Sequence, residues 1–538
     1  MWSSDEGRYA EIPREMLEQG NFVSPHLNYV PYFEKPPLVY WFTAMNLWLF
    51  GQGEASARFW PSFLGALGLL TTWFFASRWF GRETGLWSTW FLLSCVGWFL
   101  VGRYLVLDMP FTFFLSLGLF CFLEGFESDN KAFLLAAYVL LGLATLIKGI
   151  IAGVFPFLIV SFYVTWTRQW RRWQKTGVLW GIPVVLAVVL PWFVMVCKKN
   201  PTFFEFFFVH EHIQRFISHE AGRPGHFYYF FMVGMLFFFP WSLFVFCIGD
   251  KLCSLKSPTT PEDRKRLFLL VWVGVIFLFF TISRSKLPPY ILPVLPPLAI
   301  LMGSWVKRVL GTITAGEVTG YRKLVPALFG TAFITVLVGA IVLVVYLTIT
   351  KKPEKTWVEH YILFVICVFV AGSGLSFLLA KRPERCKYAF VVWGMAIILS
   401  YPAVILAMEN LDPLQSTKEL ATALKAILKP QDTLAIYGGF EDFSDLPFYL
   451  KRRVMIVGTN VGELTYGSRI GDQREWFMSE DDFRNHIAKA LREGKKVYCL
   501  AQKNEYNELL EKGIRNWDVL LQTPKAYVLV QSPSGREG

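Results

Sequence analysis

Charged and polar residues that could do chemistry occur in six separate segments of an otherwise apolar chain. These candidate residues are Asp5, Glu34, Lys35, Asp108, Lys148, His210, Arg215 and Tyr290. Arginine presents a planar fork of donors to phosphate oxygens, lysine presents a point charge, and a carboxylate can orient or deprotonate an attacking group. The set therefore suits an anionic, phosphate-bearing substrate. No GxxxxGKS/T or HExxH motif occurs, so the sequence does not indicate a soluble nucleotide site.

Each candidate also has an ordinary structural explanation. Asp108 could cap the first turn of a helix, because aspartate accepts the free N–H groups there, and Lys148 could simply reach the lipid head groups. The histidine-rich segment 198–226 could be a hydrated loop. Glu34 and His210 could form a metal pair, for zinc or another divalent ion, but two ligands are a weak signal because zinc usually takes three or four.

The sequence FEKPPL, residues 33–38, predicts a stiff corner. Proline fixes φ and keeps the preceding residue extended. Such a corner would hold Lys35 at the membrane surface, where a cation can meet an anionic lipid head group. A phosphate held there, where no nucleotide is available, is most simply a lipid phosphate.

The elements that must position these residues follow from composition. The chain has 538 residues, of which 54% are hydrophobic, and its mean hydropathy is +0.40. Runs such as SFLGALGLLTTWFFASRWF approach the roughly 20 apolar residues that cross a bilayer. The net charge of +12 lies in the loops between such runs and does not indicate nucleic acid. The eight cysteines are scattered without a CxxC pair, as is typical of small core residues. The composition predicts a polytopic α-helical membrane protein.

Hydropathy predicts about twelve membrane-spanning helices, each with boundaries good to a few residues. They cover residues 56–80, 84–102, 108–126, 131–147, 149–166, 177–197, 227–248, 266–282, 288–306, 323–350, 358–380 and 387–408. A membrane domain of residues 1–410, with outer loops at 1–55 and 198–226, is therefore expected.

Lysine and arginine assign the sides of the membrane. The loops at 78–83, 127–131, 167–176, 249–266, 307–323 and 381–387 carry more of these residues than the connections opposite them. Cytoplasmic loops carry this excess, and WTRQWRRWQK, residues 166–175, is the clearest example. The opposite connections, the N-terminal segment and the C-terminal part are then expected outside. The candidate residues all fall on that outer face.

After residue 411 the pattern changes to short strands alternating with helices. DTLAIYGG, RVMIVGT, KKVYCLAQ and KAYVLVQS are typical of strands, and residues 416–428 and 480–493 have helical periodicity. The sequence predicts a soluble α/β domain over residues 411–538. A charged segment of 55 residues that lies outside the membrane must be carried across it. A start upstream of Met1 that supplies a preceding helix would explain this, and the alternative is that the segment crosses unaided with the first span.

Several motifs resemble one family of membrane enzymes. DEGRYAEIPREML, NYVPYFEKPPLVYWF, GRYLVLDMPFTFF, FVHEHIQRF and SKLPPYILP are similar, in order along the whole chain, to GT-C glycosyltransferases of the 4-amino-4-deoxy-L-arabinose lipid A transferase type. They are more distantly similar to protein O-mannosyltransferases. The resemblance implies a polyprenyl-phosphate sugar donor and an envelope acceptor such as lipid A. It also implies thirteen spans, a periplasmic C-terminal domain and a place in the bacterial inner membrane. Twelve predicted spans then correspond to loss of the first.

The resemblance also implies roles for the candidate residues. Asp5 matches the catalytic aspartate, and Asp108 and Lys148 match residues needed for activity. The groups that hold the lipid phosphate correspond to Lys35, Arg215 and Tyr290. Glu34 and His210 match the metal pair, so a divalent ion such as zinc is a possible cofactor.

Other functions remain open at this point. A protein O-mannosyltransferase-like enzyme would glycosylate protein rather than lipid. A transporter or flippase for a lipid-linked sugar would show internal repeats and polar groups near the bilayer midplane, which this sequence does not. A membrane scaffold would act through its outer α/β domain. The donor sugar is also open, because no residue indicates an amino-sugar pocket.

Overall fold

The computed structural model describes residues 1–532 except 3, 169, 215–224, 257, 259, 316–318, 350–355 and 459–460. The chain forms two compact units. The α/β unit consists of Met1–Trp60, Met195–Phe203 and Glu409–Gly538, and the helical unit consists of Pro61–Val194 and Phe204–Met408.

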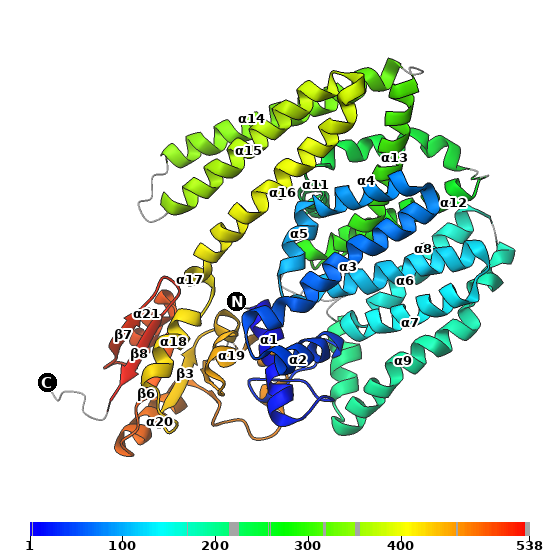
Figure 1. Ribbon diagram of the computed structural model, residues 1–538. Helices are drawn as coiled ribbons and strands as arrows, with labels where there is room; N and C mark the ends of the chain where they lie inside the picture. The colour runs from blue at the N-terminus through cyan, green and yellow to red at the C-terminus, as the bar shows by residue number, and fades with distance from the viewer. Residues whose placement is uncertain are drawn as a thin grey trace. The chain divides into compact units, whose positions relative to one another are not determined.

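The helical unit is built from long apolar helices (Figure 1). Its elements, with α3, α9 and α16 continuing into the other unit, are α3 (Glu54–Phe80), α4 (Arg82–Leu93), α5 (Val96–Arg103), α6 (Asp108–Ser128), α7 (Lys131–Lys148), α8 (Ile151–Trp166), η1 (Trp170–Thr176), α9 (Val178–Lys199), η2 (Glu205–Gln214), α11 (Tyr229–Phe237), η4 (Ser242–Lys256), α12 (Pro261–Ile282), η5 (Pro288–Val294), α13 (Leu295–Ala315), α14 (Thr319–Ile349), α15 (Thr356–Ala380), η7 (Pro383–Arg385) and α16 (Cys386–Asn410). Within the described residues, nine helices are long and apolar enough to cross a membrane, or eleven if each of two bent pairs is one span. The prediction of a polytopic helical membrane protein is therefore confirmed.

Every predicted span corresponds to a helix or to a bent pair. The span predicted at 84–102 is the pair α4 and α5, and the span at 227–248 is the pair α11 and η4. The span predicted at 149–166 is α8, which has 16 residues and is too short for the same length test. The positions of the helices were therefore predicted from hydropathy, whereas the exact number of twelve spans is not confirmed.

The two bends lie against each other inside the helical unit. α4 and α5 meet at 61° across Ser94 and Cys95, and α11 and η4 meet at 105°. The second break contains Pro240, which has no N–H to continue a helix. The N–H of Val96 donates to the carbonyl of Phe239 over 3.1 Å. The N–H group freed at one break and the carbonyl group freed at the other therefore satisfy each other. An apolar environment requires such pairing of backbone groups.

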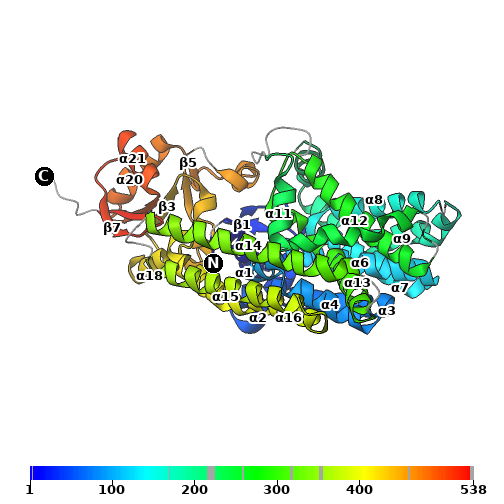
Figure 2. The same ribbon diagram turned by 90° about the horizontal axis from the view of Figure 1, so that it is seen from above.

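The helices differ in how far protein encloses them. In α6, and in the span formed by η5 and α13, 94% and 89% of the apolar stretch is buried, against 17% in both α14 and α15. Figure 2 shows α14 and α15 side by side, and they pack mainly on each other. α6 packs on α7, and α13 packs on α4. Because α6 is enclosed, the carboxylate of its first residue, Asp108, is held among protein groups rather than against lipid.

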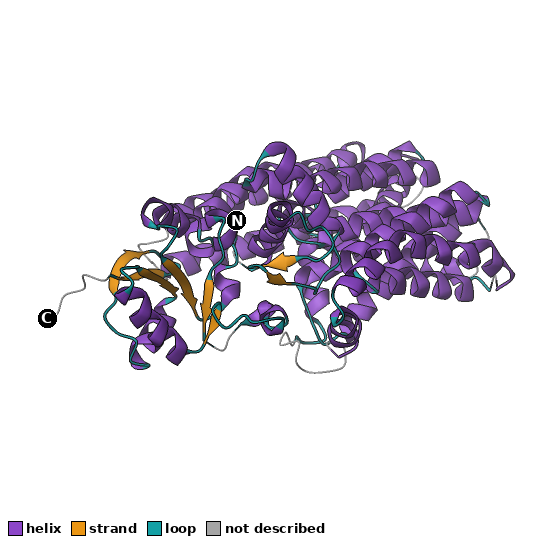
Figure 3. Cartoon of the chain, turned by 90° about the horizontal axis from the view of Figure 1, so that it is seen from below, coloured by secondary structure: helices purple, strands orange, loops and turns teal. Residues whose placement is uncertain are grey.

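The α/β unit contains the strands that the structure describes (Figure 3). Its elements are α1 (Asp5–Gln19), β1 (His26–Leu27), β2 (Val30–Pro31), α2 (Leu38–Phe50), α17 (Asp412–Gln415), α18 (Lys418–Ile427), β3 (Thr433–Tyr437), η8 (Phe440–Phe443), α19 (Leu446–Leu450), β4 (Met455–Val457), η9 (Gly462–Leu464), η10 (Gly467–Arg469), β5 (Phe477–Met478), α20 (Glu480–Arg492), β6 (Val497–Ala501), α21 (Lys503–Glu511), β7 (Asp518–Gln522) and β8 (Tyr527–Gln531). β1 and β2 form an antiparallel pair, and the other six strands form a sheet in the order β5-β4-β3-β6-β8-β7.

The C-terminal sheet confirms the predicted α/β domain. The four predicted strands are β3, β4, β6 and β8, and the two predicted helices are α18 and α20. Strands β3 to β6 pair in parallel, and β8 is antiparallel to β6. Phe483 and Ile487 of α20 and Leu509 of α21 pack on one face of the sheet. β7 was not predicted, and its side chains, unlike those of the predicted strands, are mostly exposed.

The N-terminal segment packs against the C-terminal domain within the α/β unit. The N–H of Ser4 donates to the carbonyl of Glu441 over 2.8 Å, and Ser444 Oγ donates to the carbonyl of Ser4 over 2.9 Å. A Cβ on Gly7 would lie 2.4 Å from the backbone nitrogen of Asp445, so only glycine permits this close approach. These contacts fix the start of α1, where Asp5 lies.

A buried polar face anchors the rest of α1. The Arg14 guanidinium donates to Glu11 over 2.6 and 2.7 Å and to Glu18 over 2.6 Å. The N–H of Tyr29 donates to Glu15 Oε2 over 3.0 Å. Burial raises the pKa of Glu15 well above its usual value, and the neighbouring Glu11 carboxylate adds to the shift. Folding therefore shifts the balance of Glu15 toward its protonated form relative to an exposed glutamate.

This shift predicts that Glu15→Gln stabilises the protein at neutral pH. A carboxyl whose pKa is raised by folding contributes stability below its unfolded value of 4.5 and loses it as pH rises through the folded value. Glutamine cannot ionise and still accepts the Tyr29 N–H. We expect the variant to have the higher Tm at about pH 8, with the difference vanishing at about pH 4.

Glu18→Gln serves as the control, because its expected effect on stability at neutral pH is opposite to that of Glu15→Gln. Hydrogen bonds from Tyr29 and Arg14 outweigh the effect of burial and lower the pKa of Glu18. Glu18 therefore contributes stability above 4.5 that is lost on acidification, and its variant should be the less stable one at neutral pH. Equal Tm values for Glu15→Gln and wild type across this range would contradict the prediction.

Candidate functional site

Two candidate residues form an ion pair at one end of a helical hairpin. α6 begins at Asp108 and α7 ends at Lys148, so the antiparallel packing of the two helices brings these residues together. Lys148 Nζ lies 2.5 Å from Asp108 Oδ1, and the side chains are 15% and 14% exposed. The ion pair takes the place of the two ordinary explanations, helix capping by Asp108 and contact of Lys148 with lipid head groups. The N-cap of α6 is Leu107, which makes no side-chain cap, and Lys148 donates to the Asp108 carboxylate.

A third candidate, Tyr290, completes this cluster from a distant segment. It lies in η5, which packs against α6. Lys148 Nζ lies 5.0 Å from the centroid of the Tyr290 ring and 5.3 Å from that of Phe111, within reach of cation–π attraction. The Asp108–Lys148–Tyr290 cluster therefore holds one ammonium group between a carboxylate and two rings. Such a group can stabilise negative charge that develops beside it.

The α/β unit holds a second cluster around Arg8, which is not among the candidate residues predicted from the sequence. The Arg8 side chain is 5% exposed and forms ion pairs with Asp5 and with Glu463 of η9. Asp5, by contrast, is 56% exposed. The spacing of Asp5 and Arg8, one helical turn apart, could have indicated their pairing. Glu463 lies more than 450 positions away and gave no signal in the sequence.

Two tyrosine rings lie beside the Arg8 guanidinium. Its carbon lies 4.7 Å from the centroid of the Tyr9 ring and 5.9 Å from that of Tyr32. Burial alone would lower the pKa of Arg8, but Tyr32, Tyr9, Asp5 and Glu34 together raise it, so the guanidinium stays charged. The hydroxyl groups of Tyr32 and Tyr40 are buried without a hydrogen-bond partner among the described residues. A polar ligand such as a sugar or phosphate could satisfy these donors.

The remaining candidates are placed only in part. Glu34 and Lys35 lie in a bend directly before α2, as the proline corner predicts. His210 belongs to η2, but its side chain lies outside the described part of the structure, and so does all of Arg215. Lys35 and Glu34 belong to the α/β unit, whereas Asp108, Lys148 and Tyr290 belong to the helical unit.

The described residues do not extend the predicted metal pair. They contain no group of three or more histidine, cysteine, aspartate or glutamate side chains that could hold a metal ion. Glu34 alone would be a poor site, because zinc usually takes three or four protein ligands. Metal binding at Glu34 and His210 therefore stays a prediction, and no chemical step is assigned to a metal.

Two families match different parts of the chain. Residues 2–207 match the dolichyl-phosphate-mannose-protein mannosyltransferase family, and residues 420–531 match the aminoarabinose transferase C-terminal domain. The first covers the Asp5–Arg8 and Asp108–Lys148 pairs, and the second covers Glu463.

Known proteins are similar over nearly the full length. The undecaprenyl phosphate-alpha-4-amino-4-deoxy-L-arabinose arabinosyl transferase of Yersinia pestis is 29% identical over 508 residues, which cover 92% of this chain and 88% of the relative. The enzyme of the same name from Enterobacter sp. (strain 638) is 29% identical over 519 residues, with the same coverage. The crystal structure of ArnT from Cupriavidus metallidurans bound to undecaprenyl phosphate superposes with a TM-score of 0.84. It is 28% identical, with 99% of this chain and 94% of that chain covered. The crystal structure of the same protein in the apo state superposes with a TM-score of 0.82.

Proposed function

Because this chain belongs to the ArnT-like aminoarabinose transferase family of membrane glycosyltransferases, we propose that it transfers a sugar from a polyprenyl-phosphate donor to an envelope acceptor. The observation that carries this proposal is the match over 99% of the chain to a structure bound to undecaprenyl phosphate. Aminoarabinose is the sugar in the names of the similar arabinosyl transferases. The acceptor proposed here is lipid A or a related glycolipid.

The reaction replaces one C–O bond by another. An acceptor oxygen attacks the anomeric carbon of the donor sugar, and the bond from that carbon to the phosphate oxygen breaks. The electron pair leaves with the polyprenyl phosphate, which gains negative charge. Preorganised cations around the leaving oxygen lower the barrier because they interact most strongly with the transition state.

The chain's own residues divide these tasks. Lys35, Arg215 and Tyr290 are proposed to hold the phosphate, with Tyr290 donating a hydrogen bond. Lys148 would add positive charge, and Asp108 would keep its ammonium group in place through their 2.5 Å contact. Asp5 would orient the acceptor, or deprotonate it where the acceptor is a hydroxyl group rather than an anionic phosphate.

The proposed location is the bacterial inner membrane. The multispan helical fold and the likeness to the arabinosyl transferases support this location. The excess of lysine and arginine in alternate loops supports a periplasmic position for the candidate residues and the C-terminal domain.

A transfer assay with the purified full chain tests this function. Undecaprenyl-phosphate aminoarabinose and a panel of other polyprenyl-phosphate sugars are offered with lipid A, extracted envelope lipid or protein as acceptor. We expect sugar on lipid with wild type and loss of about 10²–10³ in rate in Asp5→Ala and Lys35→Ala. The exposed residues Asp481 and Lys495, changed to alanine, serve as matched controls.

The other outcomes separate the alternatives. Sugar on protein but not on lipid would favour a protein O-mannosyltransferase-like enzyme, which the match over residues 2–207 also suggests. Movement of lipid-linked sugar across reconstituted bilayers without any transfer would contradict the enzyme proposal and favour a flippase.

A further inference from the structure

A basic cavity lies in the helical unit, far from the Asp108–Lys148–Tyr290 cluster. It has a volume of about 320 Å³ and lies between the junction of α3 with α4, the start of α12 and the end of α13. Arg266, Lys307 and Arg308 line it together with Glu262, Ser304 and Thr84. The described lining therefore carries three cations and one carboxylate. Its volume is in the range of about 300–1,000 Å³ that ligand pockets occupy.

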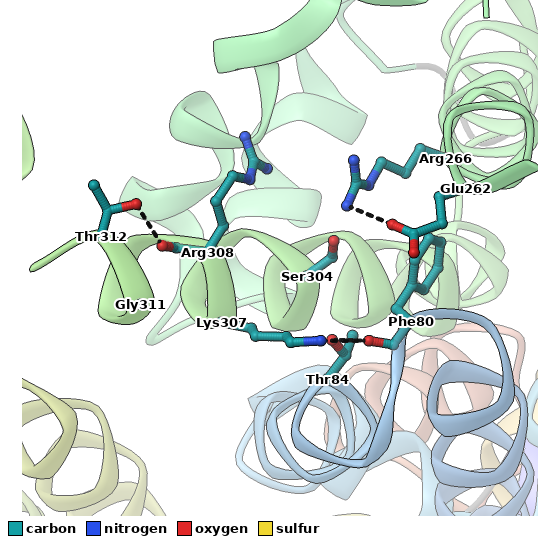
Figure 4. Close-up of a pocket in the computed structure, with 9 residues that line it drawn as sticks. All are labelled: Phe80, Thr84, Glu262, Arg266, Ser304, Lys307, Arg308, Gly311 and Thr312. Carbon is teal, nitrogen blue, oxygen red and sulfur yellow. Dashed lines mark hydrogen bonds and ion pairs between the residues drawn. The ribbon is translucent and has the colours of Figure 1, made fainter. Parts of the chain in front are cut away.

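The two arginines converge on one side of α13. Figure 4 shows the guanidinium groups of Arg266 and Arg308 on the same side as the Ser304 hydroxyl. Arg266 also contacts carboxylates of its own helix, Glu262 over 3.5 Å and Asp263 over 3.6 Å. These distances exceed the roughly 2.7–2.9 Å of a tight charge-assisted hydrogen bond. A phosphate group between the arginines would share Arg266 with these carboxylates.

The third cation has a structural role instead. Lys307 Nζ donates to the carbonyl of Phe80 over 2.8 Å, on the opposite side of α13 in Figure 4. Phe80 is the last residue of α3, and a lysine at a helix C-terminus satisfies a free carbonyl group. The ligand-binding role therefore falls to Arg266 and Arg308.

The cavity lies at the opposite end of α12 from the end that leads into η5 and Tyr290. Arg266 precedes Ile282, the last residue of α12, by roughly four turns, or about 24 Å along the axis. The segments that line the cavity contain or adjoin the loops at 78–83, 249–266 and 307–323, which loop charge predicts to be cytoplasmic. Topology alone explains cations in such loops. It does not explain two arginines from different helices, each partly buried around one cavity.

We propose that this cavity binds a phosphate ester, either the head group of an anionic phospholipid in the facing leaflet or a free phosphate compound. Arginine binds phosphate oxygens through two parallel N–H groups, and Ser304 or Thr84 can donate one further hydrogen bond. Basic pockets between membrane helices are suited to anionic lipid head groups. A smaller adjoining cavity of about 20 Å³ shares Arg266, Ser304 and Arg308 and is also lined by Asp263, Leu270 and Leu301.

Binding to the delipidated full chain in detergent tests the proposal. The probes are a short-chain phosphatidylglycerol, a short-chain phosphatidylcholine and inorganic phosphate, with affinity measured by titration calorimetry. We expect phosphatidylglycerol to bind wild type and the double variant Arg266→Gln/Arg308→Gln to bind it at least about tenfold more weakly. The control Lys131→Gln/Lys175→Gln removes the same charge from exposed sites outside the cavity and should bind like wild type.

The outcomes distinguish the two sources of phosphate. Weakened binding of phosphatidylglycerol alone would identify a lipid site, and an equal loss of inorganic phosphate would identify a site for the phosphate group itself. Equal affinity of variant and wild type, or equal binding of phosphatidylcholine, would overturn the proposal. If the glutamine variant does not fold, Arg266→Lys/Arg308→Lys keeps the charge but loses the planar fork, and it should bind several-fold more weakly.

Discussion

Replacing Lys148 by methionine is expected to lower the kcat of sugar transfer by about 10²–10³. Methionine keeps most of the apolar stem but removes the ammonium group that lies 2.5 Å from Asp108 and 5.0 Å from the Tyr290 ring. The change also leaves the Asp108 carboxylate without its cation in a largely buried position. Steady-state kinetics with saturating donor measure the effect.

A double-mutant cycle shows whether Asp108 and Lys148 act together. If Asp108 serves to hold the ammonium group, Asp108→Asn should slow transfer, and the double variant should be little slower than Lys148→Met alone. Lys175→Met is the matched control, because Lys175 pairs with Asp129 over 2.7 Å but both side chains are about half exposed. A Lys148→Met enzyme with a rate within about threefold of wild type would remove Lys148 from the proposed mechanism.

Replacing Arg8 by methionine is expected both to destabilise the protein and to slow transfer. The Arg8 side chain is only 5% exposed and is shared between Asp5 and Glu463. Breaking a buried ion pair by removing one partner costs about 3–5 kcal/mol, because the other charge stays buried without compensation. Asp5 would also lose the contact that orients it, so kcat should fall by about 10²-fold with a smaller change in KM. Thermal unfolding and steady-state kinetics measure the two effects.

A second substitution separates positioning from folding. Adding Glu463→Gln to Arg8→Met removes the uncompensated carboxylate, so it should restore most of the Tm without restoring kcat. Arg8→Lys should also stay slow, because a single ammonium group does not reproduce a guanidinium that serves two carboxylates. Arg474→Met is the control at a pair that is 90% and 67% exposed, and neither quantity should change there. Full recovery of kcat in the double variant would show that Arg8 acts only through stability.

Both clusters show which residues of the candidate site could be predicted from motifs and which could not. Asp108, Lys148 and Tyr290 were selected as charged or polar residues at the ends of apolar runs, and the structure brings them into contact. Their pairing could not be predicted, because it depends on α6, α7 and η5 packing together. Glu463 was missed because a single glutamate in a polar loop has no pattern that marks it.

The sequence by itself determined the class of the protein and the places of its elements. Apolar runs of membrane length are long and repeated, so their positions could be predicted locally. The same holds for the short, mostly buried apolar runs that form strands β3, β4, β6 and β8. The proline corner before α2 is equally local, because two prolines restrict their own backbone.

Only the tertiary structure decided which of these local elements meet. It bends two apolar runs at residues 94–95 and 238–241, and no hydropathy value reports such a bend. It also joins the first 60 residues to the last 130 in one compact unit and gathers Arg266 and Arg308 around a cavity. Contacts between distant segments depend on complementary shape and charge in both segments. The sequence of one segment does not show which other segment complements it.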